Sequence, residues 1–183
     1  MSDMDPRENT DAVDREIVVD RQIACAEQPP ASALPTENQL THWVSAVLQQ
    51  HPDELRGELT IRFVEDDESR ELNHTYRGRN KPTNVLSFPF ESPPEIDLPL
   101  LGDLVICPAI VNREASEQHK TPVHHYAHMV IHGTLHLLGY DHIEDDQAEI
   151  MEQQERDILA TLGIPDPYTA EDGGSFPPDD PSH

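Results

Sequence analysis

The stretch HGTLHLLGYDH, residues 132–142, predicts a helix that ends at a metal site. On an α-helix, residues four apart lie on one face about a turn apart, so His132 and His136 can bind the same ion. Gly139 can adopt the left-handed conformation that ends a helix, after which the chain can turn back and bring in His142. Three protein ligands leave a fourth position for water, which is how catalytic zinc is held.

The ligand type favours one zinc ion per chain, because three neutral imidazoles suit a borderline metal. Nickel, cobalt and copper are other divalent transition metals that fit, since affinity alone does not select among them. A histidine pair at this spacing also occurs on ordinary half-buried helix faces. The third histidine beyond the glycine, with leucines between, favours the metal site.

The spacing matches the zinc-protease pattern H-E-x-x-H-x-x-G-x-x-H except at one position. The protease needs a glutamate as general base after the first histidine, where this chain has Gly133. The stretch therefore predicts metal-assisted hydrolysis without the protease's base, and the sequence leaves the general base unassigned. Either a metal-activated water attacks the substrate directly, or a hydroxyl of the substrate is the nucleophile.

Histidines continue back along the predicted helix at every fourth residue: His124, His128, His132 and His136. Each such step drifts about 40° around the helix, so the four cannot all face one ion. His128 is expected one turn before the site, where it orients a ligand or touches substrate, or is simply hydrogen-bonded to a neighbour. His124 is expected at the surface.

Outward from this helix, period-two alternation and β-branched residues predict strands, while apolar residues at helical spacing predict helices. The expected strands cover residues 16–25, 58–64, 84–90 and 102–107. The expected helices cover residues 36–50, 67–76, 108–118, 122–139 and 144–162. This order predicts an α+β fold: a small mixed four-stranded sheet surrounded by about five helices, with the metal site at the end of a central helix.

Residues 15–164 are expected to form a single metal-dependent hydrolase domain. The acidic residues 1–14 and the Pro- and Asp-rich residues 165–183 contain little to bury and are expected to be mobile tails. No stretch is apolar enough to span a membrane, and no signal peptide is evident. Two distant cysteines, Cys25 and Cys107, are expected to be reduced core residues. A cytoplasmic location follows.

The formal net charge is -24, and its distribution matters more than its size. The acids of residues 144–157 are expected to form the solvated face of a helix. Four of the 12 cations lie close together in the chain, at Arg70, Arg77, Arg79 and Lys81. Such a local cationic patch is compatible with phosphate binding at one place on an otherwise acidic protein.

The stretch 132–142 resembles the signature H-G-x-L-H-L-x-G-Y-D-H of the YbeY family, bacterial endoribonucleases of ribosomal RNA maturation. Residues 72–89, with LNHTYRG and PTNVLSFP, and residues 102–106, GDLVI, are similar to two further blocks of that family. The three blocks stand in the family's order. One departure is Asn84, where many members carry aspartate; we expect its role to be structural.

The resemblance implies a single-strand-specific, zinc-dependent endoribonuclease acting in 16S rRNA 3′-end maturation and ribosome quality control. It implies zinc binding by His132, His136 and His142 and a catalytic role for Arg77 in RNA cleavage. An arginine fork can hold two phosphate oxygens and stabilise charge in the transition state. Ribosomal RNA is the implied partner, with ribosomal or ribosome-associated proteins as further candidates.

Two other functions are compatible with the same residues. One is a metal-dependent hydrolase of another class, such as a peptidase, although Gly133 disfavours that reading. The other is a non-catalytic ribosome-biogenesis factor that zinc stabilises, because the sequence contains no RNA-binding module with exposed aromatic platforms.

Overall fold

Four strands form one mixed sheet in the computed structural model, which describes residues 16–25, 34–93, 95–140 and 144–168. They are β1 (Val18–Ala24), β2 (Glu58–Val64), β3 (Val85–Pro89) and β4 (Leu100–Ile106), in the order β1-β2-β4-β3. The pairs β1–β2 and β2–β4 are parallel, whereas β3 is antiparallel to β4. The predicted four-stranded mixed sheet is confirmed, and β3 lies at one of its edges.

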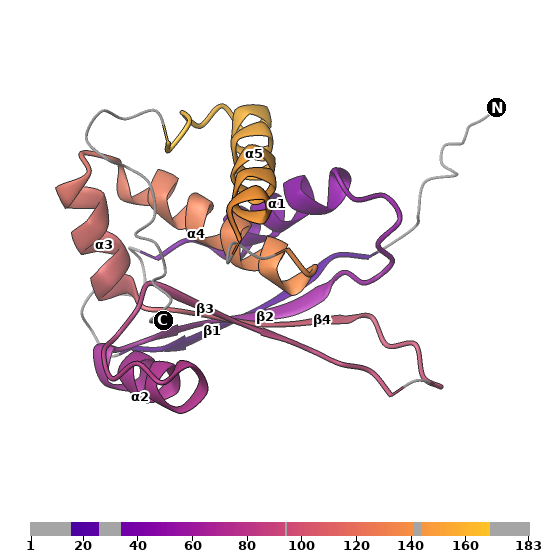
Figure 1. Cartoon of the computed structure of the whole chain (residues 1–183), viewed down its shortest axis with the longest axis horizontal. Coiled ribbons are helices and arrows are strands. Elements are labelled where there is room, and N and C mark those ends of the chain that lie inside the picture. Colours follow the sequence, from indigo (N-terminus) through magenta and orange to yellow (C-terminus); the bar gives the residue numbers. More distant parts are fainter. Residues whose placement is uncertain (1–15, 26–33, 94, 141–143, 169–183) are drawn as a thin grey trace.

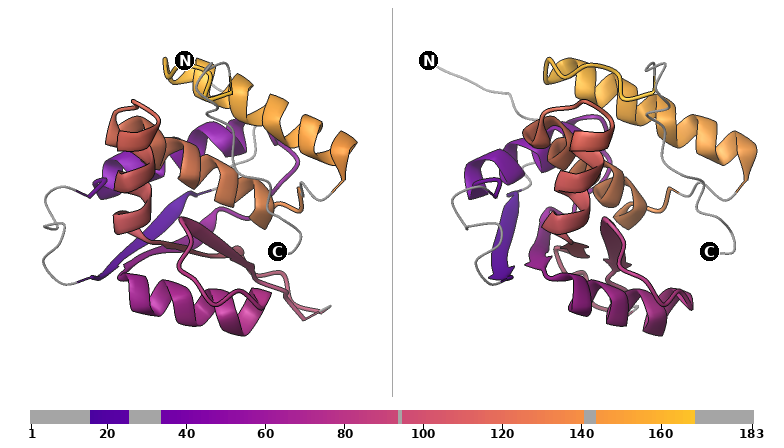
Figure 2. Two further views of the ribbon diagram at one scale, coloured as in Figure 1. Left: turned by 60° about the vertical axis from the view of Figure 1, so that its left-hand side comes forward. Right: turned by 90° about the vertical axis from the view of Figure 1, so that its left-hand side faces the viewer.

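Five helices are present in the described ranges, and they lie unequally on the two sides of the sheet (Figure 1). One side carries α1 (Glu37–Gln49), α3 (Pro108–Glu117), α4 (Pro122–Leu137) and α5 (Asp145–Thr161). The other side carries α2 (Asp66–Arg77) alone, as the turned views of Figure 2 confirm. The predicted α+β fold is confirmed, with each helix and strand within about two residues of its expected bounds.

The helix ends follow from local chemistry that the sequence contains. The Thr36 hydroxyl accepts a hydrogen bond from the Gln39 amide at 3.1 Å, and the Gln39 side chain accepts one from the Thr36 amide at 2.9 Å. This reciprocal capping starts α1. At α4 the Thr121 side chain accepts from the His124 amide, and Pro122 lies in the first turn. Gly78, at φ 75°, ends α2.

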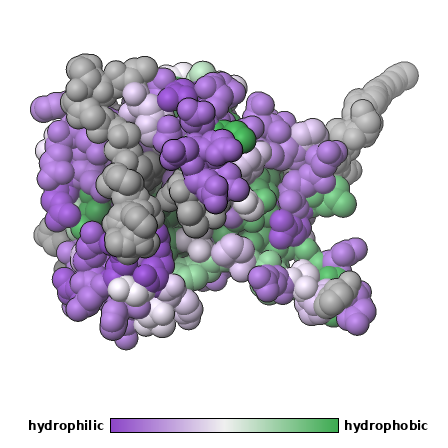
Figure 3. All heavy atoms as spheres, viewed as in Figure 1, coloured by the Kyte–Doolittle hydropathy of each residue, from purple (hydrophilic) through white to green (hydrophobic). Residues whose placement is uncertain are grey.

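The core is centred on α4, which contacts α1, α3, α5, β3 and β4. Met129, Val130, Ile131 and Leu135 of this helix are fully buried. A smaller cluster on the other side of the sheet joins the buried residues Val64, Leu86 and Val105 to α2. Hydrophilic residues cover most of the helical side, while hydrophobic residues gather near the level of the sheet (Figure 3). The helix expected to carry the metal site is therefore held from several directions.

The cysteine prediction is confirmed, because Cys25 and Cys107 are both free and buried. Burial raises the pKa of the Cys107 thiol to about 11, so this thiol stays protonated at neutral pH. No helix in the described part of the chain has the length and apolar character needed to cross a bilayer. The predicted tail 1–14 and most of the tail 165–183 lie outside the described residues, but the chain is described beyond the expected boundary, to Tyr168.

Gly102 and Gly78 both have positive φ, but only Gly102 lies where β3 and β4 approach closely. A Cβ at Gly102, φ +145°, would lie 2.3 Å from the carbonyl oxygen of Phe88, whereas a Cβ at Gly78, φ +75°, would meet open space. We expect Gly78→Ala to lower the free energy of unfolding by about 1 kcal/mol, from backbone strain alone. We expect Gly102→Ala to lower it by about 3 kcal/mol or more, because backbone atoms must also move. Urea unfolding measures both, and equal losses would contradict this account of the strand contact.

Candidate metal centre

His132 and His136 lie together at the C-terminal end of α4. Their ring centroids are 4.7 Å apart, with the ring planes at 82°. The helix ends as expected, since Gly139 has φ 106° and the Tyr140 amide donates to the Leu135 carbonyl at 3.1 Å. His142 lies outside the described residues. Within the described ranges no third histidine, cysteine or acid completes a metal-binding group, so the three-ligand site stays a prediction.

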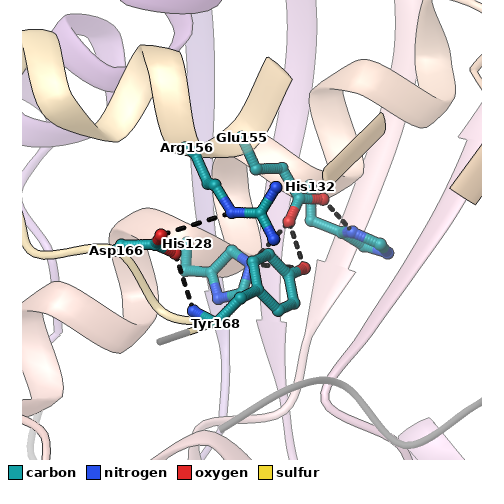
Figure 4. A network of polar contacts seen from close by, with 6 residues as sticks. All are labelled: His128, His132, Glu155, Arg156, Asp166 and Tyr168. Carbon is teal, nitrogen blue, oxygen red and sulfur yellow. Dashed lines mark hydrogen bonds and ion pairs between the residues drawn. The ribbon is translucent and has the colours of Figure 1, made fainter. Parts of the chain in front are cut away.

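The buried carboxylate of Glu155 connects α5 to α4 (Figure 4). Glu155 has no exposed surface. Its Oε2 lies 2.5 Å from His132 Nδ1, and its Oε1 lies 2.8 Å from His128 Nε2. The Tyr168 hydroxyl donates to the same Oε1. Glu155 thus receives contacts from α4 and from the segment that follows α5.

The charge states of these groups follow from burial and from one another. Burial alone would raise the pKa of the Glu155 carboxyl, but the attraction of His132 and His128 and their hydrogen bonds hold it well below its usual range. Burial lowers the pKa of His128, against the weaker opposing effect of Glu155. Burial and the charge of Glu155 raise the pKa of Tyr168. At neutral pH, Glu155 is therefore ionised and accepts hydrogen bonds, while His128 and the uncharged Tyr168 hydroxyl donate them.

This assignment determines which nitrogen of His132 can bind a metal. An ionised carboxylate only accepts hydrogen bonds, so the Nδ1 of His132 must carry the proton that it donates to Glu155. The nitrogen that can offer a lone pair to a metal is then Nε2. Metal-binding histidines commonly donate their other nitrogen to a carboxylate in this way, which orients the ring and raises its basicity. The residues present fit a zinc-type ion.

Sequence reasoning missed Glu155, which it assigned to the solvated acidic face of residues 144–157. That assignment is wrong for this residue, because Glu155 points into the protein beside buried Met151, Ile158 and Leu159. The signal was present, since an acid at helical spacing within an apolar stripe is buried with its neighbours. His128 lies one turn before His132, as expected, and is bound to Glu155. His124 is half-buried.

Gly133 is explained by packing of α4 against the sheet. A Cβ there would lie 2.8 Å from a methyl carbon of Leu104 and 3.2 Å from Ser87 Oγ, which itself donates to the Gly133 carbonyl. The position after His132 therefore faces the sheet. A glutamate there would point into the core, so it could not serve as the general base that zinc proteases use.

Arg77 is the exposed last residue of α2, on the opposite side of the sheet from α4. The edge strand β3 lies between the two helices. Ser87 of this strand contacts Gly133 of α4, while the neighbouring Phe88 packs edge-on against Tyr76 of α2, with ring centroids 5.1 Å apart. Arg77 and the histidine pair are thus separated by the edge of the sheet.

The loop after Arg77 is held against α2 by buried polar side chains. The Ser69 hydroxyl donates to the Thr83 carbonyl at 3.0 Å, and Asn73 donates to the Lys81 carbonyl at 2.8 Å. Lys81 is exposed and Arg79 is half-buried. The two loop residues of the cationic patch, Arg79 and Lys81, therefore lie on a supported loop, and the other two lie on α2.

Asn84 also has a structural environment, as expected. Its amide donates to Glu114 at 3.1 Å, and its Oδ1 accepts from the Val85 amide at 2.6 Å. Glu114 accepts a further hydrogen bond from His125 at 2.9 Å. An aspartate at position 84 would place a second carboxylate against Glu114, which accounts physically for the amide in this chain.

The chain is similar to several known proteins. The sequence model of the family described as Endoribonuclease YbeY matches residues 24–163. A curated relative from Chromohalobacter salexigens, named Endoribonuclease YbeY, is 61% identical over 150 residues, which cover 82% of this chain and 96% of the relative. The solution structure of a Thermotoga maritima protein is 30% identical, with a TM-score of 0.48, and the match covers 78% of this chain and 91% of that one.

The packing at Gly133 predicts the effect of placing the protease's glutamate there. We expect Gly133→Glu to lower the free energy of unfolding by several kcal/mol, because an unpaired carboxylate would be buried against the sheet. Gly133→Ala should cost only about 1 kcal/mol, since helix propensity partly offsets the overpacking. Val123→Glu, on the exposed start of the same helix, is the matched control and should be nearly neutral. A stable Gly133→Glu protein with peptidase activity would contradict the packing account.

Proposed function

The chain belongs to the YbeY family, and we propose that it is a zinc-dependent endoribonuclease specific for single-stranded RNA. We further propose that it acts in the cytoplasm on ribosomal RNA, in 16S rRNA 3′-end maturation and ribosome quality control. Ribosomal or ribosome-associated proteins are its proposed protein partners. The observation that carries the metal dependence is the His132–His136 pair, with His132 Nδ1 held by buried Glu155.

His132, His136 and His142 would hold the ion. When bound, it supplies a Lewis acid that activates water and polarises the phosphodiester near neutral pH. The chain's own residues prepare the site: Glu155 directs Nε2 of His132 away from itself, and Gly133 keeps any side chain out of the contact with the sheet. The general base stays unassigned.

The RNA surface that we propose is the outer side of α2 and the loop after it. Arg70, Arg77 and Lys81 are exposed there, and their charge favours phosphates in a chain of net charge -24. Tyr76 is 64% exposed, with its ring edge-on to Phe88. An exposed aromatic ring beside cations can stack an unpaired base. Sequence reasoning found the cations but not this platform.

The arrangement around β3 supports single-strand specificity. The cations and Tyr76 lie on one side of the sheet, and the histidine pair lies on the other. A bound RNA that reaches both must bend around the edge strand β3. A single strand bends readily and exposes its bases, whereas a duplex is stiff and keeps them stacked.

The metal assignment predicts that the purified chain holds about one zinc ion per molecule. His132→Ala, His136→Ala and His142→Ala should each lower zinc content sharply and abolish cleavage of a single-stranded RNA oligonucleotide. His124→Ala, on the same helix, is the control and should keep both. Metal content by mass spectrometry and RNA cleavage are measured on the same samples.

The outcomes of that experiment separate the three functions. Stoichiometric zinc without cleavage of any single-stranded RNA would favour the non-catalytic biogenesis factor. Robust peptidase activity in the unmodified chain would favour a hydrolase of another class. Full zinc content after removal of both His132 and His136 would show that the site lies elsewhere.

The cationic surface predicts two distinguishable kinetic effects. If the Arg77 guanidinium reaches past the edge of β3 to the scissile phosphate, Arg77→Ala should lower kcat on the order of a hundredfold, because an arginine that stabilises transition-state charge contributes a few kcal/mol. Arg77→Lys should rescue only partly, since an ammonium lacks the two-pronged fork. Tyr76→Ala should mainly raise KM, by roughly tenfold, whereas Tyr76→Phe keeps a ring that stacks and should behave like wild type.

Steady-state kinetics on one RNA oligonucleotide, with zinc content checked for each variant, measures these effects. Lys81→Ala is the control for charge alone and should weaken binding in a salt-dependent way with little effect at saturating RNA. Normal turnover of Arg77→Ala at saturation would reduce Arg77 to a binding cation.

A further inference from the structure

The buried carboxylate of Glu155 depends on hydrogen-bond donors from outside its own helix. An ionised carboxylate without exposed surface must have its oxygens satisfied, or the burial is strongly unfavourable. Oε2 receives His132, and Oε1 receives both His128 and Tyr168. Tyr168 comes from residues 166–168, which follow α5 and which we call the C-terminal segment.

The C-terminal segment is fastened to α5 by Arg156, the neighbour of Glu155. Arg156 Nε lies 3.2 Å from Asp166 Oδ2, and its guanidinium carbon lies 5.3 Å from the centroid of the Tyr168 ring. Asp166 Oδ1 accepts the Tyr168 amide at 2.8 Å. Consecutive residues of α5 therefore contact the segment at two levels, Arg156 near the surface and Glu155 inside (Figure 4).

Tyr168 also contacts the histidine that precedes the candidate metal ligands. Its ring meets His128 edge-on at 5.5 Å between centroids, and its hydroxyl lies 3.3 Å from His128 Nε2. The hydroxyl and His128 together fix Oε1, which leaves Oε2 directed at His132. Loss of the hydroxyl would leave Glu155 freer to rotate about its terminal bond, and His132 would lose its fixed orientation.

We infer that the C-terminal segment is a positioning element of the metal centre, in which Tyr168 acts through Glu155 to hold His132 ready for metal binding. The inference rests on the metal assignment of the proposed function. It makes zinc affinity depend on a tyrosine distant in sequence from the histidines. Tyr168 is a positioning residue and contacts no substrate in this scheme.

The test compares zinc affinity of the full chain with that of Tyr168→Phe, which keeps the ring and removes only the hydroxyl. Competition against a chromogenic chelator should give an affinity lower by up to about tenfold, because losing a direct partner of a ligand costs roughly 10- to 100-fold and Tyr168 acts one contact further out, through Glu155. The visible spectrum of the cobalt-substituted protein should also change, because it reports ligand geometry. A purely structural role for Tyr168 would lower thermal stability and leave that spectrum unchanged.

Two carboxylate variants form a matched pair, in which one tests the segment and the other is its control. Asp166→Asn removes the ion pair that fastens the segment and should lower zinc affinity, by less than Tyr168→Phe. Asp157→Asn removes the same charge from an exposed position on α5, where it accepts from Gln153 in the same helix. This second variant should bind zinc like wild type.

Wild-type zinc affinity and an unchanged cobalt spectrum in Tyr168→Phe would overturn the inference. If Tyr168→Phe does not fold, Asp166→Asn and Arg156→Gln decide in its place: weaker zinc binding in both supports the inference, and unchanged binding overturns it. A wild-type chain that binds no zinc would remove both the metal assignment and this inference. Tight zinc binding without RNA cleavage would instead remove only the proposed endoribonuclease activity.

Discussion

The buried carboxylate of Glu155 is the interaction on which the candidate site depends. It lies without solvent contact between α4 and α5, and its two oxygens accept from two histidines and a tyrosine. Because an ionised carboxylate cannot donate, its position determines the tautomer of His132 and the nitrogen available to a metal. One acid thus determines the chemical form of a candidate metal ligand.

The second constraint is the close approach of α4 to the sheet. Gly133 removes the side chain that would meet Leu104 and Ser87, and Gly102 allows β4 to pass the Phe88 carbonyl. Helix α4 can therefore lie directly on β3 and β4, with His132 and His136 toward its C-terminal end. The same closeness explains why the protease pattern fails at its second position. The residue after His132 points at the sheet, where a base would reach neither water nor substrate.

Much of the fold was predictable because its signals are local. Capping at Thr36, the left-handed Gly78 and the alternation of residues 58–64 each act within a few residues. The histidine pair was predictable for the same reason. Glu155 was missed because residues 144–157 contain six other acids, and only the helical phase of Met151, Ile158 and Leu159 distinguishes it. The separation of Arg77 from α4 by β3 depends on sheet order, which local patterns do not contain.

The charge arrangement reconciles an acidic chain with an anionic substrate. Three neutral imidazoles would add no negative charge to a divalent ion, and Glu155 would offset only one of its two positive charges from behind His132. The centre would stay positive toward phosphate. On the other side of β3, α2 and the loop after it carry the exposed cations at positions 70, 77 and 81 and the exposed ring of Tyr76. Attraction for RNA would then be confined to two places joined by one edge of the sheet, while the net charge of -24 disfavours phosphates elsewhere. A strand that passes over this edge would gain both attractions.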